Sequence, residues 1–124
     1  MQLLESKLVI LVSGDRNWTN IDTVYRELSK YREYAVTLVH GGARGLDSIA
    51  HNTALEFGWE TKEYPAHWDK FGKAAGPIRN QEMLDKERPN FLLAFHPNIE
   101  FSRGTKDMVN RATKAGIPVT IVIT

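Results

Sequence analysis

Five short apolar runs recur along the chain and are separated by longer, more polar segments. They cover residues 7–12, 36–39, 59–64, 91–95 and 119–123, and most are rich in Val, Ile, Leu or Phe. Unbroken apolar runs of this length are typical of strands that are buried on both faces of a parallel sheet. The pattern therefore predicts a parallel sheet of five strands.

Between these runs, apolar residues recur at the three- and four-residue spacing of amphipathic helices. The spacing predicts helices over 21–28, 46–57 and 108–115, and a shorter helix over 78–84. Thr19 or Asn20 would cap the first helix, while Gly58 and Gly116 would end the second and the last. Strands that alternate with helices predict an α/β three-layer sandwich, in which residues 65–77 form one long loop.

Composition narrows the class of protein. The 124 residues are enough for one domain, so we expect a single domain over residues 1–124. The net charge is +1, which argues against a nucleic-acid binder that works through bulk positive charge. The chain has no cysteine, no apolar stretch of membrane-spanning length and no signal-peptide pattern, so we expect a cytoplasmic protein without membrane contact.

Chemically distinctive residues follow four of the predicted strands. Ligands of an open parallel sheet bind outside the carboxyl ends of its strands, so these residues should share one edge. The candidate ligand-binding residues are Ser13, Gly14 and Arg16 after the first strand, Gly41, Gly42, Arg44, Gly45 and Asp47 after the second, Asn80 after the third, and Ser102, Gly104 and Thr105 after the fourth. Arg79 and Asp107 stand beside them in the sequence and should lie at the same edge.

The segment 41–45 has three glycines in five residues and opens onto a predicted helix. Free N–H groups at a helix start, the helix dipole and the guanidinium of Arg44 all favour a phosphate or a carboxylate. The alternative is a tight strand-to-helix turn with a surface arginine. The segment matches neither G-x-G-x-x-G nor G-x-x-x-x-G-K-[ST], so it does not indicate a dinucleotide dehydrogenase or a P-loop enzyme.

Two acidic residues are expected in first helical turns. Asp107 would either favour the helix dipole or act on a ribose or a glycosidic bond, and Ser102 or Gly104 would cap its helix. For Asp47 the structural role is the stronger hypothesis.

Two aromatic residues of the long loop, Trp68 and Phe71, could stack on a base or pack beneath the loop. No His pair has the spacing of a zinc site, so we expect neither a metal nor a cofactor.

Several longer stretches resemble the YspA branch of the YpsA-related SLOG family. They are GGARGLD at 41–47, PAHWD at 65–69, GKAAGPIRN at 72–80 with Met83, Ala94-Phe95, and GTKDM at 104–108, within a match from about Leu8 to Val122. The resemblance implies a Rossmann-like fold that binds a nucleotide or a nucleotide-derived small molecule, as a sensor or ligand-binding module. It also implies a homo-oligomer.

Two relatives in the SLOG superfamily imply alternatives. Arg79 and the stretch 104–107 are similar to LOG phosphoribohydrolases, which cleave nucleoside monophosphates. By that resemblance Gly104 and Thr105 hold the phosphate, while Arg79 and Asp107 act at the ribose and are the candidate catalytic residues. Asp107 replaces a glutamate of the LOG motif, and a shift of about 1 Å can cost about 100-fold in rate, so binding ranks ahead of hydrolysis. Residues 43–51 are similar to the DNA-processing proteins, which implies single-stranded nucleic-acid binding as a third function.

Overall fold

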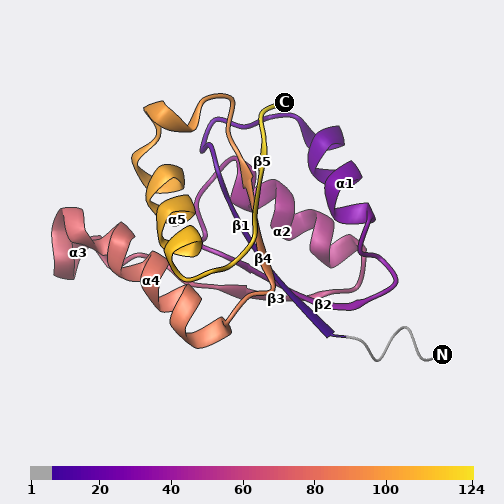
Figure 1. Cartoon of the computed structure of the whole chain (residues 1–124). Coiled ribbons are helices and arrows are strands. Elements are labelled where there is room, and N and C mark those ends of the chain that lie inside the picture. The colour runs from indigo at the N-terminus through magenta and orange to yellow at the C-terminus, as the bar shows by residue number, and fades with distance from the viewer. Residues whose placement is uncertain (1–6) are drawn as a thin grey trace.

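A parallel sheet of five strands forms the centre of the computed structural model, which describes residues 7–124 (Figure 1). The strands are β1 (Lys7–Gly14), β2 (Ala35–His40), β3 (Glu60–Glu63), β4 (Phe91–Phe95) and β5 (Val119–Val122). They lie in the order β3-β2-β1-β4-β5, which is that of a Rossmann-like fold. The predicted strands and the α/β fold class are confirmed.

Helices cover both faces of the sheet (Figure 1). On one face lie α1 (Ile21–Ser29) and α2 (Leu46–Glu56), and on the other lie α4 (Ala75–Glu87) and α5 (Arg103–Lys114). Three short helices join them: α3 (Trp68–Phe71), the 3-10 turn η2 (Gly72–Ala74) and the 3-10 turn η3 (Ile99–Phe101). No helix among the described residues has the length and apolarity that a membrane crossing requires.

The alternation of side chains along β1 divides the core in two. Ile10 and Val12 pack with the residues of α1 and α2, whereas Leu11 packs with those of α4 and α5. All three side chains are buried. The unbroken apolar sequence of this strand is therefore explained by helices on both of its faces.

The prediction for residues 65–77 is wrong, because this stretch contains α3, η2 and the first turn of α4. With 13 residues α4 is also the longest helix of residues 7–124, not a short one. Ala75 and Gly76 are buried in its first turn but are too small to produce an apolar stripe. Pro77 is compatible with a first turn, where its missing N–H would have no acceptor in any case.

Asn20, rather than Thr19, caps α1. Its side-chain oxygen accepts a hydrogen bond from the N–H of Thr23 at 3.1 Å. The predicted ends of α2 and α5 are confirmed, because Gly58 and Gly116 follow these helices with φ of 75° and 79°. Such left-handed conformations favour glycine.

We expect Asn20→Ala to lower the free energy of unfolding by about 1 kcal/mol, because the N–H of Thr23 loses its acceptor. Thr19→Ala is the matched control, since Thr19 is exposed and does not cap the helix, and should change stability by less than about 0.5 kcal/mol. Urea unfolding monitored by circular dichroism measures both. Equal losses in the two variants would contradict this assignment of the cap.

Candidate functional site

A cavity of about 540 Å³ opens at the carboxyl edge of the sheet, beside the ends of β1 and β4. These two strands are neighbours, with Gly14 paired to Phe95. The chain leaves β1 towards α1 on one face and leaves β4 towards α5 on the other, so the connections diverge here (Figure 1). Ligands of open parallel sheets bind at such a switch point. We call this space the carboxyl-edge cavity.

Ten of the fourteen predicted site residues line the carboxyl-edge cavity. They are Ser13, Gly14, Arg16, Asp47, Arg79, Asn80, Ser102, Gly104, Thr105 and Asp107. The lining also includes Lys73, Arg103 and Phe101, which were not among the predicted site residues. With Arg16 and Arg79, the first two place four cationic side chains around one cavity.

The remaining four residues, Gly41, Gly42, Arg44 and Gly45, are not part of the cavity lining. Three N–H groups of the segment 41–45 bind protein acceptors instead. Those of Gly41 and Ala43 each donate to Oδ2 of Asp47 at 3.1 Å, and that of Gly42 donates to Nδ1 of His40 at 3.0 Å. The carboxylate of Asp47 thus takes the position that we expected for a ligand anion, which supports a structural role for Asp47.

Close packing explains two glycines of this segment. A Cβ at Gly45 would overlap the backbone carbonyl of Arg16, and Gly45 has φ of 72°. A Cβ at Gly41 would overlap the guanidinium of Arg79. These glycines therefore let neighbouring groups approach the main chain, and those groups are parts of the protein.

Arg79 ties α4 to the ends of two strands. Its Nη1 donates to the carbonyl oxygens of Gly41 at 2.7 Å and Tyr64 at 3.1 Å, and its Nε donates to Oδ1 of Asn80 at 3.0 Å. Burial lowers the pKa of this guanidinium, while the charge of Asp47 acts in the opposite direction. Arg79 lines the cavity, but Nε and Nη1 of its guanidinium are already bound to protein oxygens.

A polar network continues from α4 to α5. Oδ2 of Asp107 accepts from Nδ2 of Asn80 at 2.9 Å and from Nε of Arg111 at 2.8 Å. The predicted place of Asp107 in a first turn is wrong. The helix begins at Arg103, directly after its cap Ser102, so Asp107 lies in the second turn. Its carboxylate is held by two donors rather than by the helix dipole.

The start of α5 forms part of the cavity wall. Ser102 is the cap, as predicted, and its hydroxyl accepts from the N–H of Thr105 at 3.0 Å. Thr105 is buried, whereas Gly104 is exposed. A Cβ added at Gly104 would meet no atom within 4 Å, so no protein group requires a glycine at this position.

The structure pairs His40 with His51, a contact that sequence spacing did not indicate. Nε2 of His40 lies 3.0 Å from Nδ1 of His51. Because Nδ1 of His40 accepts from Gly42, Nε2 carries the proton and donates to His51. Burial, together with the neighbouring His51, lowers the pKa of His40 to about 4.

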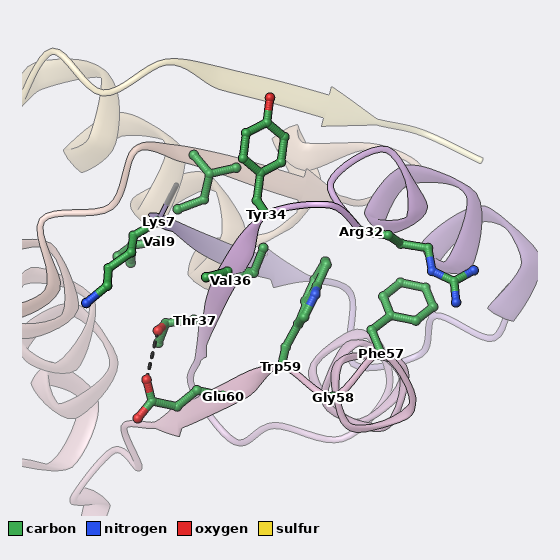
Figure 2. A pocket seen from close by; sticks show the side chains of 12 residues that line it. Lys7, Val9, Arg32, Tyr34, Val36, Thr37, Phe57, Gly58, Trp59 and Glu60 are labelled. Atoms are coloured by element: carbon green, nitrogen blue, oxygen red, sulfur yellow. Dashed lines mark hydrogen bonds between the residues drawn. The ribbon is translucent and has the colours of Figure 1, made fainter. Parts of the chain in front are cut away.

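A second hollow, of about 450 Å³, lies at the amino edge of the sheet (Figure 2). The guanidinium of Arg32 lies 4.5 Å from the centre of the Phe57 ring, which meets Trp59 edge to face at 5.1 Å. The indole N–H of Trp59 is buried and meets no acceptor among the described residues. None of the predicted site residues lines this hollow.

The model of the YspA, cpYpsA-related SLOG family matches residues 8–71. The chain belongs to this SLOG family. This SLOG chain is also 39% identical over 118 residues to the Gene 61 protein of Mycobacterium phage D29, a match that covers 89% of this chain and 92% of that protein.

Solved structures share the fold of this SLOG protein. The crystal structure of TM1055 superposes with a TM-score of 0.60 at 17% identity, covering 92% of this chain and 72% of that one. DNA processing protein A of Streptococcus pneumoniae gives a TM-score of 0.52 at 16% identity, covering 97% of this chain and 59% of that one. At these identities the likeness concerns the fold alone.

Over residues 7–124 of the SLOG chain, no group of three or more His, Cys, Asp or Glu side chains could hold a metal ion.

Two buried groups of the SLOG protein should have opposite effects on stability between pH 4 and pH 6. Burial raises the pKa of Asp47 from 3.8 to about 6, so the folded chain binds the extra proton and stability falls as the pH rises. The pKa of His40 is lowered from 6.5 to about 4, so the unfolded chain binds the extra proton and stability rises with pH. We expect the two slopes largely to cancel.

Asp47→Asn and His40→Asn separate these contributions. Relative to the unmutated chain, stability of Asp47→Asn should rise by up to about 1.4 kcal/mol per pH unit in this interval, and that of His40→Asn should fall by up to the same amount. Urea unfolding at pH 4, 5 and 6 measures both differences, and other carboxyl groups cancel in the comparison. Variant curves parallel to that of the unmutated chain would contradict the two pKa shifts.

Proposed function

We propose that this SLOG protein binds a nucleotide or a nucleotide-derived small molecule in the carboxyl-edge cavity, as a sensor or ligand-binding module. One observation carries the proposal: a single cavity at the switch point joins four cationic side chains to the open start of α5. Its volume of about 540 Å³ lies within the usual range for small-molecule sites, roughly 300–1,000 Å³.

The start of α5 is suited to a phosphate. The first N–H groups of a helix have no acceptor within the helix, and the helix dipole favours negative charge there. The open space beside Gly104 would let a phosphate oxygen approach the main chain. Arg103 and Lys73 line the same cavity and are exposed, so they can add charge at the cavity mouth.

The carboxylate of Asp107 is suited to hydroxyl groups of a ribose. Hydrogen bonds from Asn80 and Arg111 hold one of its oxygens, which orients the group within the cavity wall. An ionised carboxylate has about four acceptor sites, so two protein donors leave capacity for a ligand hydroxyl. N–H groups at the start of α5 would donate to the phosphate, and the carboxylate of Asp107, about one turn later, would accept from the ribose hydroxyls. Together they would recognise a sugar phosphate.

Gly104→Val tests the phosphate position. A Cβ at this position has no protein atom within 4 Å, and a valine side chain would occupy the space in which a phosphate would approach the helix start. We expect AMP to bind about 10-fold or more weakly, while the melting temperature stays the same or rises, since valine has the better helix propensity. Isothermal titration calorimetry and thermal unfolding measure the two effects.

Thr113→Val is the matched control for this variant, because Thr113 is exposed in the last turn of the same helix. It should bind AMP as the unmutated chain does. Equal affinity of Gly104→Val and the control would contradict the phosphate position. If AMP, other nucleoside monophosphates, NAD and ADP-ribose all fail to stabilise the protein at millimolar concentration, the proposed function itself is contradicted, since a ligand at 100 Kd adds about 2.7 kcal/mol.

Hydrolysis of a nucleoside monophosphate is the second candidate function. The observation that favours it is that Arg79 and Asp107 line the same cavity, with Asn80 bonded to both. A hydrolase would release adenine from AMP, and Asp107→Asn would abolish this release. Asp22→Asn, an exposed position on α1, is the control. Release that is unchanged in Asp107→Asn, measured by chromatography, would exclude Asp107 as the catalytic acid or base.

A further inference from the structure

Two large aromatic side chains of the carboxyl-edge cavity are unusually exposed. Phe101 is 86% exposed and Trp68 is 54% exposed, and both line this cavity. Within the described part of the chain, neither ring belongs to an aromatic pair. An exposed aromatic ring gives up the free energy of burial, so two of them at one cavity indicate an interaction surface.

Trp68 is held at the cavity edge by its backbone. It begins α3, which projects from the body of the molecule beyond the start of α4 (Figure 1). The Cη2 atom of its ring lies 3.3 Å from the position that a Cβ would take at Gly76. One edge of the indole therefore rests against the first turn of α4, which limits where the ring can turn.

Phe101 is held by a hydrogen-bonded turn on another part of the cavity wall. It ends η3, in which Asn98 accepts from the N–H of Glu100 at 3.1 Å and the N–H of Ser102 donates to Ile99 at 3.0 Å. A salt bridge of 2.9 Å between Glu100 and Lys106 links this turn to α5. The exposure of Phe101 thus belongs to an ordered turn directly before the helix start.

We infer that Trp68 and Phe101 bind the planar base of the nucleotide by stacking, so that the site recognises a base as well as a phosphate. This inference rests on the proposed function. Stacking on an aromatic side chain is available to every base, because each base has a π face. The contacts therefore select ligands with a base over bare sugar phosphates, while they discriminate little between one base and another.

The ligands AMP and ribose 5-phosphate test the inference, since they differ only in the base. Phe101→Ala and Trp68→Ala should each weaken AMP binding about 5- to 100-fold and leave the affinity for ribose 5-phosphate unchanged. Phe71→Ala is the matched control, because Phe71 is an exposed ring of the same helix as Trp68 but does not line the carboxyl-edge cavity. It should change neither affinity. Isothermal titration calorimetry measures all of these.

Tryptophan fluorescence gives an independent readout. Trp18 and Trp59 are each 7% exposed, so Trp68 is the tryptophan that a ligand in this cavity can reach. AMP should quench the fluorescence of the unmutated chain, and Trp68→Phe should lose this quenching while it retains AMP binding, because phenylalanine still offers a ring.

Different results would overturn the inference and the proposed function. AMP binding that is unchanged in Phe101→Ala and Trp68→Ala, without quenching, would overturn the stacking inference and leave nucleotide binding intact. An equal loss of AMP and ribose 5-phosphate in these variants would also overturn it, since it would indicate a general change of the cavity. If neither AMP nor the other nucleotides bind to the unmutated chain, both proposals are overturned.

Discussion

The pairing of β1 with β4 is the constraint on which the candidate site depends. It continues past the last strand residues, because the N–H of Asp15 donates to the carbonyl of Phe95 at 2.9 Å, and the carbonyl of Asp15 accepts from Leu46 at 3.1 Å. This continuation brings the end of β1 beside the start of α2. Since the connections after β1 and β4 run to opposite faces, the space between them stays open, and the carboxyl-edge cavity occupies it.

Electrostatic groups around this cavity divide into those that hold the protein together and those that face solvent. Arg79 and Asp47 belong to the first kind, because carbonyl oxygens bind the arginine and backbone N–H groups bind the carboxylate. Lys73 and Arg103 are exposed at the cavity and belong to the second kind. Two charged residues of one stretch, Lys73 and Arg79, thus differ in role, because Arg79 stabilises the protein around the cavity and Lys73 faces the solvent.

Glycines show the same division. In the segment 41–45 they allow close approach of Arg79 and of the carbonyl of Arg16, so their role is internal packing. Gly104 has open space beside it at the start of α5. None of the three glycines of this segment lines the cavity, so a single glycine after β4 is the better candidate for contact with a phosphate.

The sequence by itself determined the five strands, the two-faced burial of β1, the ends of α2 and α5 and the edge of the sheet at which most of the predicted site residues gather. These features follow from apolar periodicity and from local rules of helix ends, which act over a few residues. It also indicated ten of the residues that line the cavity, because the carboxyl ends of parallel strands share one edge. Only the tertiary structure decided that Asp47 binds the amides of the glycine-rich segment and that His40 pairs with His51. It also decided that the exposed rings of Phe101 and Trp68 line the same carboxyl-edge cavity. Those contacts join residues from separate elements, and their partners depend on packing distances that no local pattern encodes.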